Sequence, residues 1–314
     1  CHEGRGRVIS FKPFNWTNTM KDLLSPRELS RAVGVSESSL KRWVDDGQLR
    51  ATRTAGGHRR ITLDEAIRFI RHTGMRVVEP EAIGMGELTS AEPSPSAKAD
   101  SGAFVTALLD GNGPLVRGMV MHAYLSGHTV AEICDHVIAP AMHRMGELWR
   151  HDPKGIFLEH RATSLCGEAM HHLRSLLPPR DGKAPIAIGG AMSGDIYALP
   201  TLMVGVTLAA SGWNDTNLGA DTPAESMLLA ARTLKPRLVW LSFSVAAPAE
   251  ETTRQINGLA QRLAPMGTSV IVGGRHAPTR QATLHSNVHL AATMAELAAF
   301  AAGLGSVRAP RRKG

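Results

Sequence analysis

The stretch KAPIAIGGA, residues 183–191, marks the point where the sequence changes from helices to strands that alternate with helices. A short apolar run that ends in glycines is typical of a buried strand followed by a turn. Two similar runs follow, RLVWLSFSV at 237–245 and TSVIVGG at 268–274, and helical stretches separate them. This alternation predicts an α/β domain with a doubly wound parallel sheet in flavodoxin-like order.

Ligands of such sheets bind outside the carboxyl ends of the strands. The segments predicted to form a site are therefore 193–197, 218–221, 242–245 and 273–275. The GxGxxG fingerprint is absent from this part of the sequence, which argues against a dinucleotide ligand. Taken alone, the glycines and serines of these segments are explained equally well as ordinary loop residues.

Upstream of the sheet, the sequence predicts helices over 102–110, 114–125, 129–149 and 156–177. The stretch LWRHDPKGIFLEHRA, residues 148–162, interrupts them, because proline removes a backbone donor and clashes with a continuing helix. A lone Trp or His in such a block more often belongs to a core than to a site. The neighbouring histidines form no HExxH motif, so the sequence predicts no zinc site held by protein ligands alone.

The N-terminal block has the signals of two short helices joined by a tight turn. Ser25 and Glu28 form a capping box, Gly34 ends the first helix, and Ser36 can cap the second. This order describes a helix-turn-helix. The stretch LRATRTAGGHRRI at 49–61 follows; it is basic, contains no acid, and can turn at its two glycines. It predicts a β-wing whose tip contacts phosphates or the minor groove. The alternative is a small helical module with a solvated run of charge.

Composition limits the class of protein further. The net charge of +7 favours a polyanionic partner. The three cysteines, Cys1, Cys134 and Cys166, show no CxxC or zinc-finger spacing, so a reducing cytoplasm is expected. No apolar run is long enough for a membrane span, so no membrane association is expected. The predicted domains are a disordered leader (1–23), the winged helix-turn-helix head (24–76), a linker (77–100), a helical-bundle cap (101–180), the sheet domain (183–306) and a basic tail (307–314).

The head closely resembles the DNA-binding domain of MerR-family transcription regulators. The string GVSESSLKRWVDDGQL, followed by GGHRRI, carries this resemblance over about 50 residues. It implies that the second helix and the wing contact promoter DNA. The residues expected to bind DNA are Ser38, Ser39, Lys41, Arg42, Arg53, His58, Arg59 and Arg60.

The helix break resembles a signature of cobalamin-sensing regulators of the CarH and LitR type. Trp149, nine further residues and then Glu159-His160 match the W-x9-EH motif of their helical cap. The resemblance implies a lid over the upper face of a corrinoid, with an apolar wall from the Trp and hydrogen bonds from the pair to an adenosyl group. Many relatives have His directly after the Trp, whereas this chain has Arg150.

The sheet domain resembles the cobalamin-binding domain of the same regulators. MSGDIYALPTL, LGADTP, SFS and VGG fall where that family has its cofactor loops. The residues expected to bind the cofactor are Trp149, Glu159, His160, Asp195, Tyr197, Ser242, Ser244, Gly273 and Gly274.

The main departure from that family is Tyr197. The family pattern D/E-x-H-x-x-G provides a His that ligates cobalt from below, whereas this chain has Asp195, Tyr197 and Pro200 at those positions. A neutral phenol with a pKa near 10 is a poor cobalt ligand. Four outcomes follow: a corrinoid bound without a protein ligand from below, weak binding, another ligand such as a tetrapyrrole, or no binding.

These observations predict a cytoplasmic DNA-binding repressor rather than an enzyme. Its sensory module is expected to bind cobalamin, as adenosylcobalamin, and to control DNA binding through formation of a homodimer or homotetramer. A light response is expected if adenosylcobalamin is the bound form. One alternative is a regulator of the same architecture that responds to a different ligand or to a protein. Another is a corrinoid carrier or enzyme.

Overall fold

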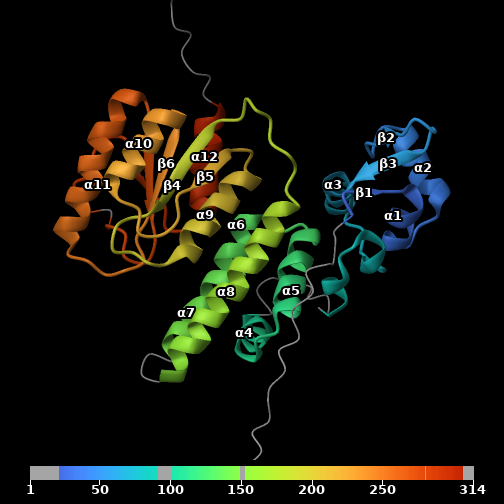
Figure 1. Ribbon diagram of the computed structural model, residues 1–314, viewed down its shortest axis with the longest axis horizontal. Helices are drawn as coiled ribbons and strands as arrows, with labels where there is room; N and C mark the ends of the chain where they lie inside the picture. The colour runs from blue at the N-terminus through green and yellow to red at the C-terminus, as the bar shows by residue number, and fades with distance from the viewer. Residues whose placement is uncertain (1–20, 91–100, 149–152, 280, 307–314) are drawn as a thin grey trace, which may run out of the picture. The chain divides into compact units, whose positions relative to one another are not determined.

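The computed structural model describes residues 21–90, 101–148, 153–279 and 281–306. The predicted tail, Trp149 and most of the predicted leader lie outside these residues. The chain forms two compact units (Figure 1). The first contains the residues up to Leu63 together with Val77–Gly86, and the second contains Asp64–Arg76 and the residues from Glu87 onward.

The first unit contains the predicted helix-turn-helix, formed by α1 (Pro26–Val33) and α2 (Glu37–Asp45). The capping box of α1 is present, since the Ser25 backbone N–H donates to a Glu28 carboxylate oxygen at 2.8 Å and Ser25 Oγ accepts from the Glu28 N–H at 3.3 Å. Gly34 ends α1 with a φ of 70°, which favours glycine. The two helices and their turn are therefore confirmed.

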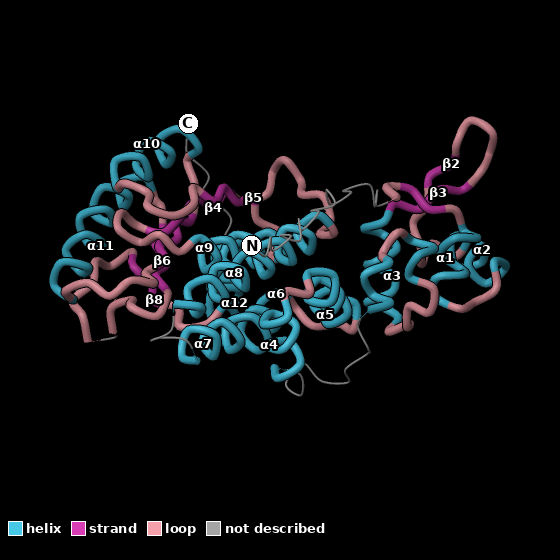
Figure 2. The backbone as a smooth tube through the Cα atoms, turned by 60° about the horizontal axis from the view of Figure 1, so that its bottom comes forward, coloured by secondary structure: helices cyan, strands magenta, loops and turns pink. Residues whose placement is uncertain are grey.

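The wing is confirmed as a β-hairpin. Strands β2 (Thr52–Arg53) and β3 (Arg59–Thr62) pair antiparallel, and Figure 2 shows the loop between them projecting from the head. A short strand that the sequence did not predict, β1 (Leu23–Leu24), pairs with the other edge of β3. Its Leu24 side chain is fully buried, which anchors this strand.

The stretch expected to begin the linker contains packed structure. Residues Pro80–Ile83 and Gly86–Ser90 form two 3₁₀ helices. The Val78 N–H donates to the Ala32 carbonyl of α1 at 2.7 Å, and Ile83 and Met85 are fully buried. These apolar side chains hold the segment against the head, so the chain leaves the first unit later than residue 77.

Helix α3 (Leu63–Thr73) belongs mostly to the second unit, although the sequence assigned it to the head. The Arg71 guanidinium lies 3.8 Å from the centre of the Tyr124 ring and donates to the His128 carbonyl at 3.0 Å. Burial lowers the pKa of Arg71. These contacts connect α3 to the helical bundle.

The helical bundle follows the predicted spans with one difference. The span predicted as a single helix over 129–149 contains a π-helical turn at Cys134–Ile138, between α6 (Val130–Ile133) and α7 (Ala139–Leu148). Such turns occur frequently at functional sites. The other helices of the bundle are α4 (Ser101–Asp110), α5 (Gly113–Leu125) and α8 (Pro153–Ser175).

The sheet is parallel, and its strand order is β5-β4-β6-β7-β8. The first strand of the block thus lies between the second and the third, which confirms the flavodoxin-like order. The sequence did not predict β8, a short edge strand. The strands are β4 (Ile186–Ala191), β5 (Asn214–Asn217), β6 (Leu238–Ser242), β7 (Ser269–Gly273) and β8 (Val288–Leu290).

Helices cover both faces of this sheet (Figure 1). Helices α9 (Ala198–Ala210) and α12 (Met294–Ser306) pack on one face around a cluster that includes Trp213 and Trp240. Helices α10 (Ala224–Leu234) and α11 (Ala249–Leu263) pack on the other face around a larger aliphatic cluster. This three-layer arrangement confirms the predicted α/β domain.

Close packing explains why the stretch KAPIAIGGA has glycine at positions 189 and 190. A side chain at Gly189 would overlap the ring of Trp240 in the neighbouring strand, and one at Gly190 would lie 2.6 Å from the Gly219 carbonyl oxygen. The Trp240 indole N–H donates to Thr201 Oγ1 at 2.8 Å, which fixes the ring.

Along the described residues, no helix combines the length and apolar character that crossing a membrane requires.

Candidate functional site

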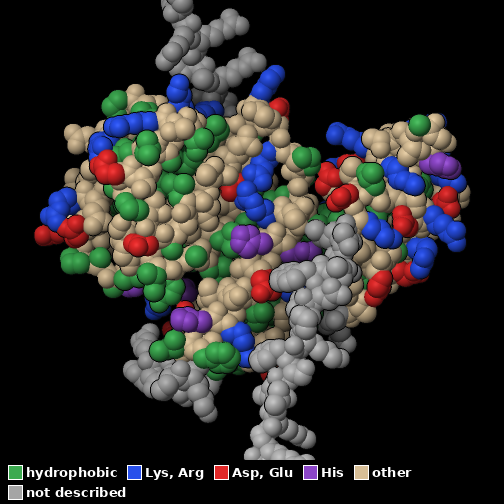
Figure 3. All heavy atoms as spheres, viewed as in Figure 1, with side chains coloured by type: hydrophobic (Ala, Val, Ile, Leu, Met, Phe, Trp, Pro, Cys, Tyr) green, Lys and Arg blue, Asp and Glu red, His purple; other side chains and the backbone are tan. Residues whose placement is uncertain are grey.

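The residues predicted to read DNA lie on the outer surface of the head. Ser38, Lys41 and Arg42 are exposed on α2, and Ser39 is half-buried. Ser36 Oγ, which caps α2, lies 2.8 Å from Ser38 Oγ and 2.9 Å from Ser39 Oγ. These hydroxyls therefore face one another as well as solvent, and Figure 3 shows Lys and Arg side chains, interspersed with acids, on the head.

The four predicted wing residues differ in their surroundings. Arg53 and His58 are exposed, whereas Arg59 and Arg60 are half-buried. Arg59 Nη2 lies 2.5 Å from Asp45 Oδ1 at the end of α2. This ion pair connects the wing to the second helix, so Arg59 helps to orient the wing in addition to carrying charge.

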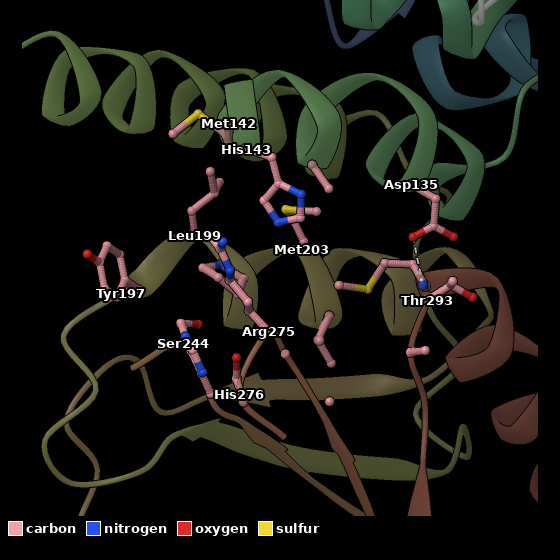
Figure 4. A pocket seen from close by; sticks show the side chains of 18 of the residues that line it. Asp135, Met142, His143, Tyr197, Leu199, Met203, Ser244, Arg275, His276 and Thr293 are labelled. Atoms are coloured by element: carbon pink, nitrogen blue, oxygen red, sulfur yellow. Dashed lines mark hydrogen bonds between the residues drawn. The ribbon is translucent and has the colours of Figure 1, made fainter. Parts of the chain in front are cut away.

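A cavity of about 700 Å³ lies at the carboxyl ends of the parallel strands, within the second unit. Helices α7 and α8 of the bundle line one side, and the strand ends with α9 and the start of α12 line the other (Figure 4). Its volume is in the range of small-molecule and cofactor sites. Its position is the one expected for ligands of doubly wound sheets.

Six of the nine predicted cofactor residues line this cavity, although they come from four separate segments. They are Glu159, Tyr197, Ser242, Ser244, Gly273 and Gly274. His160 is exposed and is absent from the lining, because successive residues of a helix point about 100° apart and Glu159 takes the inward direction. Trp149 lies outside the described residues.

Asp195 does not line the cavity, but its carboxylate connects two of the cavity's loops. Its side chain is 4% exposed, and its carboxylate accepts from the Ser244 N–H at 2.5 Å and from the Tyr197 N–H at 3.1 Å. The carboxylate therefore connects the loop after β4 with the loop after β6. This contact fixes the positions of Ser244 and Tyr197 along the cavity edge.

The two glycines after β7 lie where neighbouring backbone leaves no room for a side chain. A side chain at Gly273 would place its Cβ 2.7 Å from the Ala291 carbonyl oxygen. Gly274 has a φ of 107°, and a Cβ there would overlap the Phe243 carbonyl group. Neither position therefore tolerates a side chain, because neighbouring backbone occupies the space that it would need.

Ser244 provides a test of whether a polar ligand fits this site. Its Oγ atom is buried and has no hydrogen-bond partner in the structure. A buried hydroxyl without a partner costs stability, and such groups are uncommon in folded proteins. A ligand that hydrogen-bonds to Ser244 Oγ would remove this cost, so the site suits a large, mainly apolar ligand with polar groups at the strand ends.

Comparison with known proteins agrees with this arrangement. Residues 25–61 match the MerR family regulatory protein domain, and residues 102–174 match the B12 binding domain. The chain joins a MerR domain to a B12-binding domain. It is 28% identical over 255 residues to the HTH-type transcriptional repressor CarA of Myxococcus xanthus, covering 79% of this chain and 85% of that protein.

Two solved structures are also similar to this chain. The monomethylamine corrinoid protein of Methanosarcina barkeri is 19% identical with a TM-score of 0.47, covering 64% of this chain and 96% of that one. The methanol:cobalamin methyltransferase complex MtaBC of Methanosarcina barkeri is 17% identical with a TM-score of 0.35, covering 70% of this chain and 84% of that one.

The position of Tyr197 differs from that expected of a metal ligand. The side chain is 40% exposed at the edge of the cavity. Figure 4 shows its hydroxyl pointing away from the middle of the cavity, where Met203 and His143 lie. Its ring therefore contributes an apolar edge to the site.

Several lining residues were not predicted, because no local pattern shows that their side chains face a cavity. They include Asp135, Met142, His143, Leu199, Met203 and His276. Asp135 follows Cys134 in the π-helical turn and accepts from the backbone N–H groups of Met294 and Ala295 at 2.8 and 2.9 Å. It thereby caps α12 and connects the bundle to the sheet domain. The π-helical turn was the structural signal for this residue, and the sequence does not reveal it.

Among the described side chains, no group of three His, Cys, Asp or Glu residues is placed to hold a metal ion. Cys134 and Cys166 are both buried. Burial raises the pKa of Cys166 to about 12 and raises that of Cys134 further still. Both thiols are therefore protonated at neutral pH and serve as packing groups.

Proposed function

We propose that this chain is a transcriptional repressor that binds promoter DNA through its MerR domain and senses cobalamin through the cavity of its second unit. The observation that carries the proposal is the cavity itself. It lies between the bundle, which matches the B12 binding domain family, and the carboxyl ends of a parallel sheet. The same chain carries a winged helix-turn-helix head.

The residues of the cavity suggest how a corrinoid would be held. Ser242 and Ser244 would hydrogen-bond to polar groups of its nucleotide tail, and Gly273 and Gly274 would let that tail approach the backbone. Glu159 would hydrogen-bond to an adenosyl group from the bundle side. Adenosylcobalamin would supply a cobalt–carbon bond that light can cleave, which would make the regulator responsive to light.

The direct test is the visible spectrum of the protein purified from cells supplied with cobalamin. A corrinoid spectrum that remains after gel filtration is expected, together with binding of adenosylcobalamin by calorimetry. A colourless protein that shows no binding heat at micromolar corrinoid would contradict the proposal. The rival regulator, which senses another ligand or a protein, would then be preferred.

Replacing Ser244 with alanine should lower the affinity for cobalamin without lowering the free energy of unfolding. The variant is expected to be as stable as the wild type, or more stable by up to about 1 kcal/mol, because it removes a buried hydroxyl without a partner. Its affinity for cobalamin should fall about tenfold, the value of one lost hydrogen bond of about 1.4 kcal/mol. Thermal melts without ligand and calorimetric titrations measure the two effects. Equal losses of stability and affinity would refute the role of this hydroxyl.

A second prediction concerns the contribution of the wing arginines to DNA binding. Arg60→Ala should weaken DNA binding and reduce the slope of log affinity against log salt by about 0.9, the value for one phosphate contact. Arg59→Ala should also weaken binding, partly through loss of its ion pair with Asp45. Mobility-shift titrations at several salt concentrations provide the measurement. Arg262→Ala, an exposed site in the second unit, is the control. An unchanged slope in both wing variants would exclude the wing from the interface.

The oligomeric state is expected to depend on the ligand. MerR-type heads usually read two half-sites, which requires at least two copies of the chain. We expect a dimer or tetramer whose population changes between samples with and without adenosylcobalamin, in darkness and after illumination. Light scattering coupled to gel filtration measures this. A monomer under all four conditions that still binds DNA specifically would contradict the expectation.

The replacement of histidine by Tyr197 also favours a second candidate, in which the same architecture senses another ligand, such as a tetrapyrrole, or a protein partner. Pro200 replaces the glycine of the family pattern as well. A third candidate is a corrinoid carrier or enzyme. Specific DNA retention together with no methyltransferase activity would distinguish the regulators from that class.

A further inference from the structure

Arg275 brings a positive charge to the cavity. It follows Gly274 in the loop after β7, and Figure 4 shows its side chain extending from that loop into the cavity, toward Leu199 at the start of α9. Among the described residues, none forms a hydrogen bond or an ion pair with its guanidinium group. A guanidinium has five N–H donors and stays protonated at neutral pH. Arg275 is therefore available to bind a negatively charged group of a ligand.

The other polar groups on the sheet side of the cavity add hydrogen-bond donors. Ser244 Oγ is buried and has no hydrogen-bond partner among the described residues. Helix α9 begins at the cavity, and the side chain of its first flanking residue, Tyr197, does not cap it. The first N–H groups of a helix carry partial positive charge. Each of these groups favours an anion at this side of the cavity.

Negative charge is distributed differently. Asp195 and Asp221 lie in the neighbouring loops but do not line the cavity, and backbone N–H groups donate to both carboxylates. The acids of the described lining, Asp135 and Glu159, both lie on the bundle side. A ligand that carries one negative charge is therefore attracted to the sheet side and repelled from the bundle side.

We propose that Arg275 binds the phosphodiester of the nucleotide tail of the corrinoid and makes the cavity selective for corrinoids that carry this phosphate. The inference rests on the proposed function. The side chains of a corrin ring are neutral amides, whereas the phosphodiester carries a fixed negative charge. A guanidinium can donate two parallel hydrogen bonds to phosphate oxygens, which supplies both affinity and orientation. The tail then lies at the strand ends, beside Ser244.

The test compares three corrinoids by calorimetry with the full-length protein. They are cobalamin, cobinamide phosphate, which lacks the base and its ribose, and cobinamide, which also lacks the phosphate. Each carries an adenosyl group and is kept in darkness, so that the upper ligand is the same in all three. We expect Arg275→Gln to bind cobalamin and cobinamide phosphate at least about tenfold more weakly than the wild type does, the scale of a hydrogen bond to a charged group. Its affinity for cobinamide should be unchanged.

Two further variants and a second measurement sharpen this comparison. Arg275→Lys keeps the charge but not the paired donors, so its affinity for cobalamin should lie between those of the wild type and Arg275→Gln. Arg262→Gln is the matched control, because Arg262 is an arginine of the same unit that does not line the cavity. It should bind all three corrinoids as the wild type does. The phosphorus magnetic resonance of bound cobalamin should shift in Arg275→Gln and stay in place in Arg262→Gln.

The outcomes distinguish this inference from the proposed function. If the wild type binds cobalamin and Arg275→Gln binds all three corrinoids equally well, Arg275 does not bind the phosphate and the cobalamin site stands. If Arg275→Gln weakens cobinamide as much as cobalamin, Arg275 acts on something other than the phosphate, and the inference is again wrong. If the wild type binds none of the three, both proposals are wrong.

Discussion

Asp215→Ala is expected to lower the free energy of unfolding by about 3 kcal/mol. Asp215 lies on β5 with its side chain 1% exposed, and it pairs with Arg174 at 2.7 Å and with Arg180 at 2.6 Å. Removing the carboxylate leaves two guanidinium groups without their partner. The expected value is at the lower end for buried pairs, because the arginines retain 29% and 22% of their exposure and stay partly hydrated.

Urea denaturation followed by circular dichroism measures this effect. Asp215→Asn keeps the size of the side chain and one acceptor, so it should destabilise less than the alanine variant. Glu225→Ala is the matched control, since it breaks the exposed ion pair with Arg262 and should change the midpoint little. If Asp215→Ala had the same denaturation midpoint as the wild type, Asp215 would not stabilise the junction of α8 with the sheet.

Tyr197→His is expected to strengthen cobalamin binding about 10–100-fold, the scale on which partners at metal sites change affinity. The substitution creates a D-x-H arrangement, in which the Asp195 carboxylate already accepts from two backbone N–H groups. The absorption spectrum of the bound corrinoid should shift toward that of a histidine-ligated form.

Tyr197→Phe is the control for this experiment. It removes only a hydroxyl that points away from the middle of the cavity, so affinity and spectrum should match those of the wild type. Calorimetry and visible spectroscopy of the two variants give the comparison. If the wild type does not bind corrinoid and Tyr197→His restores no binding, the cavity is not a cobalamin site.

The sequence predicted the elements whose signals are local. Ser25, Glu28 and Gly34 specify the ends of helices through side-chain caps and a left-handed residue, and all three act as predicted. The parallel sheet followed from apolar runs that alternate with helices. Short edge strands such as β1 and β8 were missed, because two or three residues carry no periodic signal.

The predicted residues that the structure brings together at the sheet are those whose position depends on topology. Carboxyl ends of parallel strands meet at one edge, so Ser242 and Gly273 lie together although 31 positions separate them in the chain. The bundle side was predicted less well. Glu159 faces the cavity and His160 does not, since the direction of a helical side chain depends on how the helix is rotated when it packs.

The sequence by itself determined the two kinds of domain and the edge of the sheet that lines the cavity. Only the tertiary structure decided which side chains meet: Arg59 with Asp45, Asp135 with the start of α12, Asp215 with two arginines, and His143 with the cavity. The physical reason is that caps and periodicity act over a few neighbouring residues. Contacts between distant side chains depend instead on how whole elements pack, and no local pattern specifies that packing.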